Sequence, residues 1–348
     1  MNNFLEWFPT NPICNGYTKD IIIDFQRGKI YNIPNSFSQV VKSLMRYGRK
    51  VTEEKYKNNR DVLKEYYDFI VKNEFGRFYK KLGHTGIISL NDSFESPSLI
   101  NILIIESLVL ENKYLLDFTK TFKVKYVLIK LNYAEINYLK KINELIENSN
   151  ILCFEIIITG DFNKEIIKKL ALLSKKIVKI FAYNSKTTKL INLGSCLVYM
   201  INEKYEYFLN TNFSSPIINI DLQTYIESKN YNVYLNNKVY INNKQYIFNT
   251  EEDNEPIAKL NNQYKKYYSE ILKKVNNRFL KKSNDSVCKY CEYKRICIDP
   301  RYPTIKIING KETLKHRKEC SYNPFIGKWA YENDFKSLNE SINNPKSR

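Results

Sequence analysis

The chain has 348 residues, of which 43% are hydrophobic, so it is long enough for two or three domains and too apolar to be disordered. Its amino terminus, MNNFLEWFPTNPIC, lacks the basic and apolar segments of a secretory signal. Its most apolar stretches are too short and too interrupted to span a bilayer, which excludes a transmembrane class. We therefore expect a cytoplasmic protein without a membrane partner.

The formal net charge of +18 comes mostly from lysine. Such a charge is compatible with an acidic partner, whether nucleic acid, a membrane surface or a peptide. Lysine, asparagine, isoleucine and tyrosine are abundant throughout, however, as an AT-rich genome would produce. Because the chain has no arginine-rich stripe and no aromatic–glycine RNA motif, its composition does not favour nucleic acid as the partner.

The first predicted domain covers residues 1–90. Three strand-like segments, PICNGY, DIIIDFQ and KIYNIP, come first, with a tight turn at Arg27–Gly28 between the last two. Three helix-like segments follow: PNSFSQVVKSLMRYG, KVTEEKYKN and RDVLKEYYDFIVKNEFGRFY. The first and third have apolar residues at helical spacing, and in the second Thr52 can cap a helix. Three strands followed by three helices predict a winged-helix-like unit.

In the second predicted domain, residues 91–254, strand-like and helix-like segments alternate. SLINILIIES, KVKYVLIKL, NILCFEIIITG and KIVKIFAYN are continuous apolar runs, which are typical of strands buried on both faces. Helix-like segments separate them, including AEINYLKKINELIE and FNKEIIKKLALLSKK. The run is too short for eight such units, so we expect an α/β fold with a partial (β/α) barrel or an open parallel sheet.

The third predicted domain, residues 255–335, begins with a basic segment that we expect to be helical, AKLNNQYKKYYSEILKKVNNRFLKK. It leads into a cluster with the spacing Cys288-x2-Cys291-x5-Cys297, followed by Cys320. Residues 336–348 are polar and are expected to fray. Cys14, Cys153 and Cys196 stand alone in the sequence, and Cys153 and Cys196, which lie in apolar runs, are expected to be small core residues.

Four clustered thiols are typical of either a structural zinc site or an iron–sulfur cluster. Zinc ribbons usually have two CxxC pairs, whereas this chain has one, which favours a [4Fe–4S] cluster and leaves zinc as the alternative. His316 could substitute as a ligand, although its basic surroundings in the sequence favour an exposed position. Neither a phosphate-binding glycine loop nor a dinucleotide fingerprint occurs.

The segments CKYCEYKRICIDPR and CSYNPFIGKW resemble the SPASM domain that extends many radical-SAM peptide maturases. More narrowly, they are similar to the SPASM-domain peptide maturase of grasp-with-spasm systems, and NGYTKDIIIDFQRGKIYNIPNSF resembles the opening of that family. The resemblance implies that Cys288, Cys291, Cys297 and Cys320 hold one auxiliary [4Fe–4S] cluster. It also implies two partners, a ribosomally made precursor peptide and an ATP-grasp peptide ligase.

The chain departs from that family in two ways. A further cysteine that a full SPASM domain carries is replaced by Arg301, and the first auxiliary cluster has no complete ligand set. The Cys-x3-Cys-x2-Cys triad that binds the radical-generating cluster is also absent from the sequence. We therefore expect no autonomous radical chemistry. An accessory or recognition subunit is the interpretation we favour, and whether the chain is itself an enzyme stays open.

The amino-terminal unit also resembles the leader-peptide recognition element of peptide-modifying enzymes. An extended peptide can add itself to an exposed strand edge and place side chains beside a helix. The candidate peptide-binding residues are Lys29, Ile30, Tyr31, Asn32, Ile33, Tyr66 and Tyr67. Ordinary packing is the alternative for each tyrosine. The alternative function is a zinc-stapled winged-helix nucleic-acid-binding protein, although the acidic residues of the third helix-like segment argue against insertion into a DNA groove.

Overall fold

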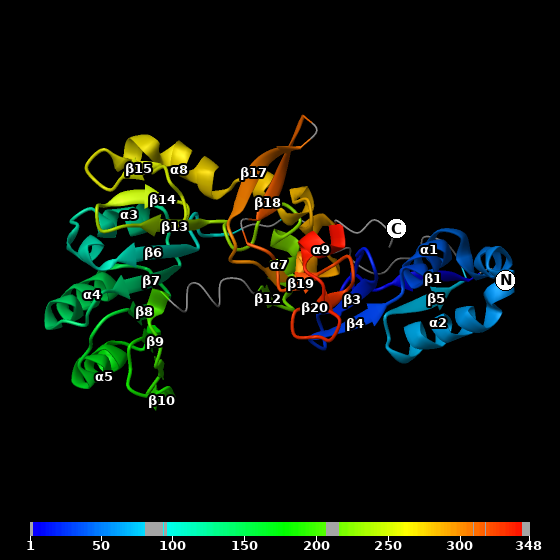
Figure 1. Cartoon of the computed structure of the whole chain (residues 1–348), viewed down its shortest axis with the longest axis horizontal. Helices are drawn as coiled ribbons and strands as arrows, with labels where there is room; N and C mark the ends of the chain where they lie inside the picture. The colour runs from blue at the N-terminus through cyan, green and yellow to red at the C-terminus, as the bar shows by residue number, and fades with distance from the viewer. Residues whose placement is uncertain are drawn as a thin grey trace. The chain divides into compact units, whose positions relative to one another are not determined.

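A computed structural model describes residues 3–80, 93, 96–206, 216–308, 310–316 and 318–342. The chain forms two compact units, both discontinuous in sequence (Figure 1). Unit 1 comprises Met1–Phe94, Ser214–Val233 and Phe279–Arg348. Unit 2 comprises Glu95–Phe213 and Tyr234–Arg278.

Unit 2 is built on a nine-stranded sheet with the order β10-β11-β9-β8-β7-β6-β13-β14-β15. The six strands from β11 to β13 in this order are mutually parallel, and β10, β14 and β15 are antiparallel to their neighbours. The strands are β6 (Ile102–Glu106), β7 (Tyr126–Leu131), β8 (Cys153–Ile158), β9 (Ile177–Ala182), β10 (Lys189–Leu193), β11 (Cys196–Met200), β13 (Lys238–Ile241), β14 (Tyr246–Phe248) and β15 (Ala258–Lys259). The predicted α/β class and its open, mostly parallel sheet are therefore confirmed.

Helices cover one face of this sheet, as Figure 1 shows for α3, α4 and α5. They are α3 (Leu115–Thr121), α4 (Ile136–Asn148), α5 (Lys164–Leu173) and α8 (Tyr268–Val275). Phe118, Ile142, Ile167 and Ile271 come one from each helix and pack with the same buried cluster as strand residues such as Ile156. Burial of these apolar faces is the main force that holds the unit together.

The basic segment before the cysteines differs from its prediction. Only α8 is α-helical there, because Ala258–Lys259 pair with β14 as strand β15, and Tyr264–Tyr267 form the 3-10 helix η3. Ala258, Tyr264 and Ile271 all join the core of unit 2. Residues 255–278 therefore belong to unit 2, together with the large sheet.

The three predicted amino-terminal strands are confirmed in unit 1. They are β2 (Ile13–Cys14), β3 (Asp20–Asp24) and β4 (Lys29–Ile33), and they form an antiparallel sheet with β3 in the centre. Gly28 has a φ of 61° in the turn before β4, a conformation that glycine adopts without steric cost.

The predicted first and second helices form one element, α1 (Asn35–Lys55), which is kinked at Gly48. The third, α2 (Arg60–Lys72), ends earlier than predicted. The FGRFY segment instead supplies β5 (Gly76–Tyr79), which pairs with β1 (Phe4–Trp7). The helical prediction failed there because pairing with β1 lies outside the local sequence.

The β2-β3-β4 sheet packs against the cysteine segment. Ile21 and Ile23 of β3 share a buried cluster with Tyr293, Ile296 and Cys297. The predicted domain 1–90 and the part of the third predicted domain from residue 279 on therefore belong to the same compact unit, because the apolar face of the amino-terminal sheet is covered by residues near the other end of the chain.

The rest of unit 1 consists of short elements around the cysteines. Three antiparallel pairs occur: β12 (Ile217–Ile218) with β16 (Cys297–Ile298), β17 (Pro303–Ile308) with β18 (Lys311–His316), and β19 (Tyr322–Asn323) with β20 (Lys328–Trp329). The helices are α7 (Leu222–Glu227), α9 (Leu338–Ile342), η1 (Lys57–Asn59), η4 (Arg278–Leu280), η5 (Lys282–Asn284), η6 (Cys288–Tyr290) and η7 (Glu292–Arg295), while η2 (Ser107–Glu111) belongs to unit 2. Part of the predicted frayed tail thus forms α9. Among the helices that the structure describes, none combines the length and apolarity needed to cross a bilayer.

Candidate metal centre in unit 1

A cavity of about 260 Å3 lies in unit 1 and is lined by Cys288, Cys291, Cys297 and Cys320. The first two cysteines belong to the short helical turns around η6 and η7, the third begins β16, and the fourth precedes β19. Segments that are 32 residues apart at their extremes (320 minus 288) thus meet at one space. The structure brings together all four thiols that the sequence singled out.

Asp285 organises the start of the cysteine segment. Its Oδ1 accepts hydrogen bonds from the backbone N–H of Val287, at 2.8 Å, and from that of Cys288, at 2.7 Å. The backbone N–H of Cys291 then donates to the carbonyl of Cys288 at 3.0 Å. Side-chain acceptance of backbone donors favours such a turn over a continued helix, and it holds the first two thiols on one short loop.

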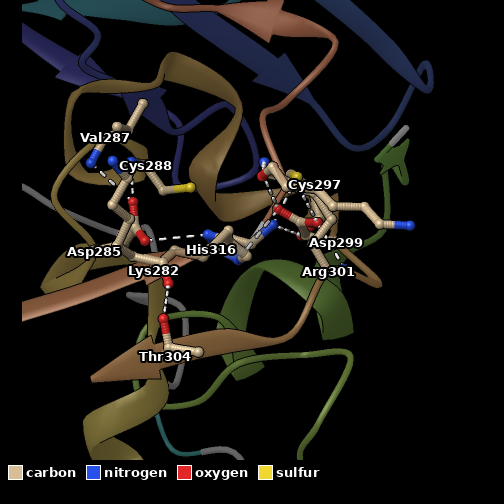
Figure 2. Close-up of polar contacts among 11 residues, drawn as sticks. Lys282, Asp285, Val287, Cys288, Cys297, Asp299, Arg301, Thr304 and His316 are labelled. Carbon is tan, nitrogen blue, oxygen red and sulfur yellow. Dashed lines mark hydrogen bonds and ion pairs between the residues drawn. The ribbon is translucent and has the colours of Figure 1, made fainter. Parts of the chain in front are cut away.

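Two buried cations lie beside the thiols (Figure 2). Lys282 is 5% exposed, and its Nζ donates to the Sγ of Cys297 at 2.6 Å and to the Cys297 carbonyl at 2.5 Å. The guanidinium of Arg301 forms a two-point pair with Asp299, with Nε–Oδ1 at 2.9 Å and Nη2–Oδ2 at 2.5 Å. Arg301 is therefore held in a buried ion pair.

Burial raises the pKa of Cys288 and of Cys291 well above the ordinary thiol value, and the Asp285 and Glu292 charges add to the respective shifts. Burial likewise raises the pKa of Cys320 to about 11, and it raises the pKa of Cys297, where Lys282 opposes the shift. Without a metal, burial thus favours the protonated form of these thiols, whereas the charge of Lys282 favours the thiolate of Cys297. A metal ion or cluster that binds here displaces those protons.

A second donor set overlaps the cysteines. One ligand atom each from Asp285, Cys288 and His316 lie within 4.8 Å of one another, so this trio could hold a metal ion. His316 Nδ1 is 3.1 Å from Asp285 Oδ2, and its Nε2 is 3.5 Å from Asp299 Oδ2 (Figure 2). The expected exposed position of His316 is wrong, since its side chain is 6% exposed. The β17–β18 hairpin carries it inward, where Ser286 N–H bonds to the Leu314 carbonyl.

The donors and the size of the cavity fit a soft metal centre. Thiolate sulfur is the preferred ligand of zinc and of iron–sulfur clusters, and imidazole and carboxylate also bind zinc. The cavity is many times larger than the roughly 10–15 Å3 that one water molecule needs. His316 Nε2 is buried with no hydrogen-bond partner among the described residues, so one further donor is available.

Aromatic side chains line one wall of the cavity. The rings of Tyr293, Tyr322 and Trp329 lie against one another. The centroids are 5.1 Å apart for Tyr293 and Tyr322, 4.7 Å for Tyr322 and Trp329, and 5.8 Å for Tyr293 and Trp329. The Tyr322 hydroxyl donates to the buried carboxylate of Glu292, whose pKa is raised by burial. Such a wall excludes water and lowers the local dielectric constant around the thiols.

The other three cysteines lie outside this cavity. Cys14 is buried in the cluster between β3 and the cysteine segment, and Cys196 is buried in the core of unit 2. Cys153 is partly buried at the start of β8. Burial raises the pKa of each thiol, which makes all three poor nucleophiles.

The predicted peptide-binding residues divide into two groups. Strand β4 is an edge of its sheet, and among the described residues it pairs with β3 alone. Lys29 and Asn32 are exposed on it, whereas Ile33 is buried and Tyr31 packs against Phe69. Ile30 packs against the cluster of Ile21 and Ile23.

The two tyrosines of α2 differ from each other. Tyr66 is partly buried, packs on Phe37 and bonds through its hydroxyl to Ser36 at 2.8 Å. Tyr67 is 7% exposed and packs on Phe78. Both tyrosines therefore contribute to packing, and they do not lie on one open face.

Sequence reasoning missed three buried groups of the centre, Lys282, Asp285 and Asp299. Charged residues near a cysteine cluster usually indicate a solvated surface, so their types gave no signal of burial. Their spacing did offer one. Asp285 lies three residues before Cys288, as a side-chain acceptor for the backbone of a turn does, and Asp299 lies two before Arg301.

No protein-family model matches this chain, and a search of curated proteins finds no significant match.

Proposed function

We propose that this protein takes part in the maturation of a ribosomally synthesised peptide, with one [4Fe–4S] cluster held by Cys288, Cys291, Cys297 and Cys320. It recognises the precursor through unit 1 and acts beside an ATP-grasp ligase that performs the ATP-dependent chemistry. One observation supports the metal centre above all others: four thiols that are spread over 33 residues (288 to 320) line a single cavity. The precursor peptide and the ligase are proposed as partners because of the family resemblance.

The charges around the cavity support a centre with a net negative charge. Four thiolates around a divalent metal or a dicationic cluster leave roughly two negative charges, which are costly to bury without a nearby cation. Lys282 supplies such a cation in direct contact with Cys297 Sγ. Arg301 and Asp299 form a neutral pair and add hydrogen-bonding structure without adding charge.

Each of the four irons of the proposed cluster would be bound by one protein thiolate. Such a cluster has no open site for a substrate, so its contribution is structural or electron-transferring. This agrees with the missing radical-SAM triad and favours an accessory role. The edge position of β4 supports the recognition part, because an extended precursor segment can pair with an edge strand.

The test is anaerobic expression of the full chain, followed by measurement of iron, acid-labile sulfide and zinc per chain. We expect about four iron and four sulfide, as the definition of the cluster requires. Stoichiometric zinc without sulfide would remove the cluster from the proposal. Capture of the precursor peptide encoded beside the gene, with retention at high salt, tests the recognition part separately.

A mononuclear zinc centre is the second candidate, and the Asp285–Cys288–His316 trio favours it. Aspartate, cysteine and histidine together form an ordinary zinc donor set. This centre would suit the alternative function, a zinc-stapled nucleic-acid-binding protein. Retention of DNA that falls steeply with salt concentration, with no capture of the peptide, would favour that alternative.

A further inference from the structure

A groove of about 480 Å3 lies in unit 1 between the second half of α1 and the start of α2, away from the cysteines. Its lining is charged except for Leu63 and Tyr67. The charged residues are Arg49, Lys50, Arg60, Lys64, Glu53 and Glu54. Four basic and two acidic side chains give the groove a positive surplus.

The two carboxylates of the groove are already paired. Glu53 accepts from Arg49 Nε at 2.7 Å, and Glu54 lies 3.6 Å from Lys57. The side chains of Arg60 and Lys64, by contrast, have neither a hydrogen bond nor an ion pair among the residues that the structure describes. The surplus positive charge of the groove is thus concentrated on the first two turns of α2.

The groove is also lined by a buried tyrosine, Tyr67, whose hydroxyl lacks a partner in the described part of the chain. The residue is 7% exposed and lines the groove, and its hydroxyl has no hydrogen-bond partner among the described residues. The guanidinium of Arg49 lies 4.7 Å from the centre of its ring. A buried hydroxyl without a partner is costly, and a ligand that accepts a hydrogen bond from it removes that cost.

We propose that this groove binds carboxylate side chains of an acidic peptide segment, with the Tyr67 hydroxyl and the Arg60 and Lys64 cations as the donors. The inference deepens the proposed recognition of a precursor peptide and rests on it. A peptide is favoured over nucleic acid because Glu53 and Glu54 lie in the same groove. Phosphates repeat along a strand about every 3.4 Å, so these carboxylates would oppose them. A peptide can instead alternate charged and neutral residues, and its apolar parts can contact Leu63.

The probe is a short fluorescein-labelled peptide of alternating glutamate and glycine, and its binding to the full-length protein is measured by fluorescence anisotropy at low ionic strength. We expect Tyr67→Phe to weaken binding about tenfold, as loss of a hydrogen bond to a charged group does. The double variant Arg60→Glu/Lys64→Glu should weaken it further.

Lys42→Glu/Lys72→Glu is the matched control. Both residues are exposed, on α1 and α2 respectively, and they are not part of the groove lining. The two double variants carry the same change in net charge. Equal loss of binding in both would overturn the proposed site, because it would show that only overall charge matters. Tighter binding of a single-stranded oligonucleotide than of the peptide would overturn the choice of ligand.

Iron, sulfide and zinc are measured in the same preparations. A full cluster without peptide binding overturns the groove assignment and leaves the metal centre standing. Peptide binding without a cluster overturns the metal centre and leaves the groove assignment standing. Circular dichroism of Tyr67→Phe shows whether the variant has kept its fold.

Discussion

The ammonium group of Lys282 donates to the sulfur of Cys297 at a distance of 2.6 Å, inside a cavity that three other thiols share. Burial alone would lower the pKa of this lysine, but the charges of Cys297 and Asp299 raise it above its ordinary value. The amine thus stays charged next to a sulfur that is predicted to bind metal. It orients that sulfur and offsets its negative charge.

Replacement of Lys282 by methionine should weaken the metal centre without removing a ligand. Groups that hydrogen-bond to metal ligands typically contribute 10- to 100-fold in affinity, so we expect a loss of about that size. The measurement is the iron or zinc retained against a competing chelator. Lys289→Met is the control, since Lys289 lies between two of the cysteines but is exposed. Equal retention in the two variants would contradict the role given to Lys282.

Loss of Arg301 alone should lower the free energy of unfolding more than replacement of both Arg301 and Asp299. Arg301→Gln leaves the Asp299 carboxylate buried without its strongest partner, and such a loss costs about 3–5 kcal/mol. Asp299→Asn together with Arg301→Gln replaces the charges by neutral groups and should cost less. Urea unfolding measures both free energies. A double variant that is less stable than Arg301→Gln alone would contradict this account.

Two further variants distinguish the cluster from a mononuclear centre. Under the proposed function, Cys291→Ser removes a ligand and should lower bound iron and sulfide severalfold, whereas His316→Gln should leave both nearly unchanged. Elemental analysis of anaerobic preparations provides the readout. Loss of metal in His316→Gln with full retention in Cys291→Ser would assign the metal to the Asp285–Cys288–His316 trio instead.

Unit 2 contains a lysine whose burial predicts a pH dependence of stability. Lys238 is 6% exposed, and burial lowers its pKa from 10.5 to about 8, with Lys130 adding to the shift and Glu251 and Glu252 opposing it. Its Nζ lies 3.6 Å from the centre of the Tyr234 ring. Between these two pKa values the unfolded chain binds more protons than the folded chain, so stability rises with pH.

From pH 7 to pH 9 this single group should add about 1 kcal/mol to the free energy of unfolding. Urea unfolding at several pH values measures the change. Lys238→Met keeps the length of the side chain and removes the charge, so the rise should be absent from that variant. A rise of the same size in the wild type and in Lys238→Met would assign the effect to other groups.

The large sheet could be predicted because its signal is local. Apolar runs such as CFEIII and IVKIFA indicate strands of a covered sheet, and they correspond to β8 and β9. The expected burial on both faces is wrong, because several residues of each strand are only partly buried. The strands around Gly28 could be predicted for a similar reason, since a turn glycine lies between two apolar segments. In these regions the fold follows from neighbours in sequence.

The rest depends on contacts between distant residues. GRFY became a strand because FLEW lies beside it, although the two segments are 69 residues apart (76 minus 7). The sequence did indicate the four cysteines, since metal-ligand spacing is itself a local pattern. The burial of Lys282, Asp285, Asp299 and His316 is set by the hairpin and the turns that surround them, and residue type alone argues against it.

The discontinuity of unit 1 has a consequence during synthesis on the ribosome. Ile21 and Ile23 leave the ribosome early, but Tyr293, Ile296 and Cys297, which cover them, follow more than 260 residues later. At translation rates of about 5–20 residues per second, that interval is on the order of tens of seconds. The face of the nascent amino-terminal sheet that carries Ile21 and Ile23 thus lacks its final cover for this time, until the cysteine segment emerges.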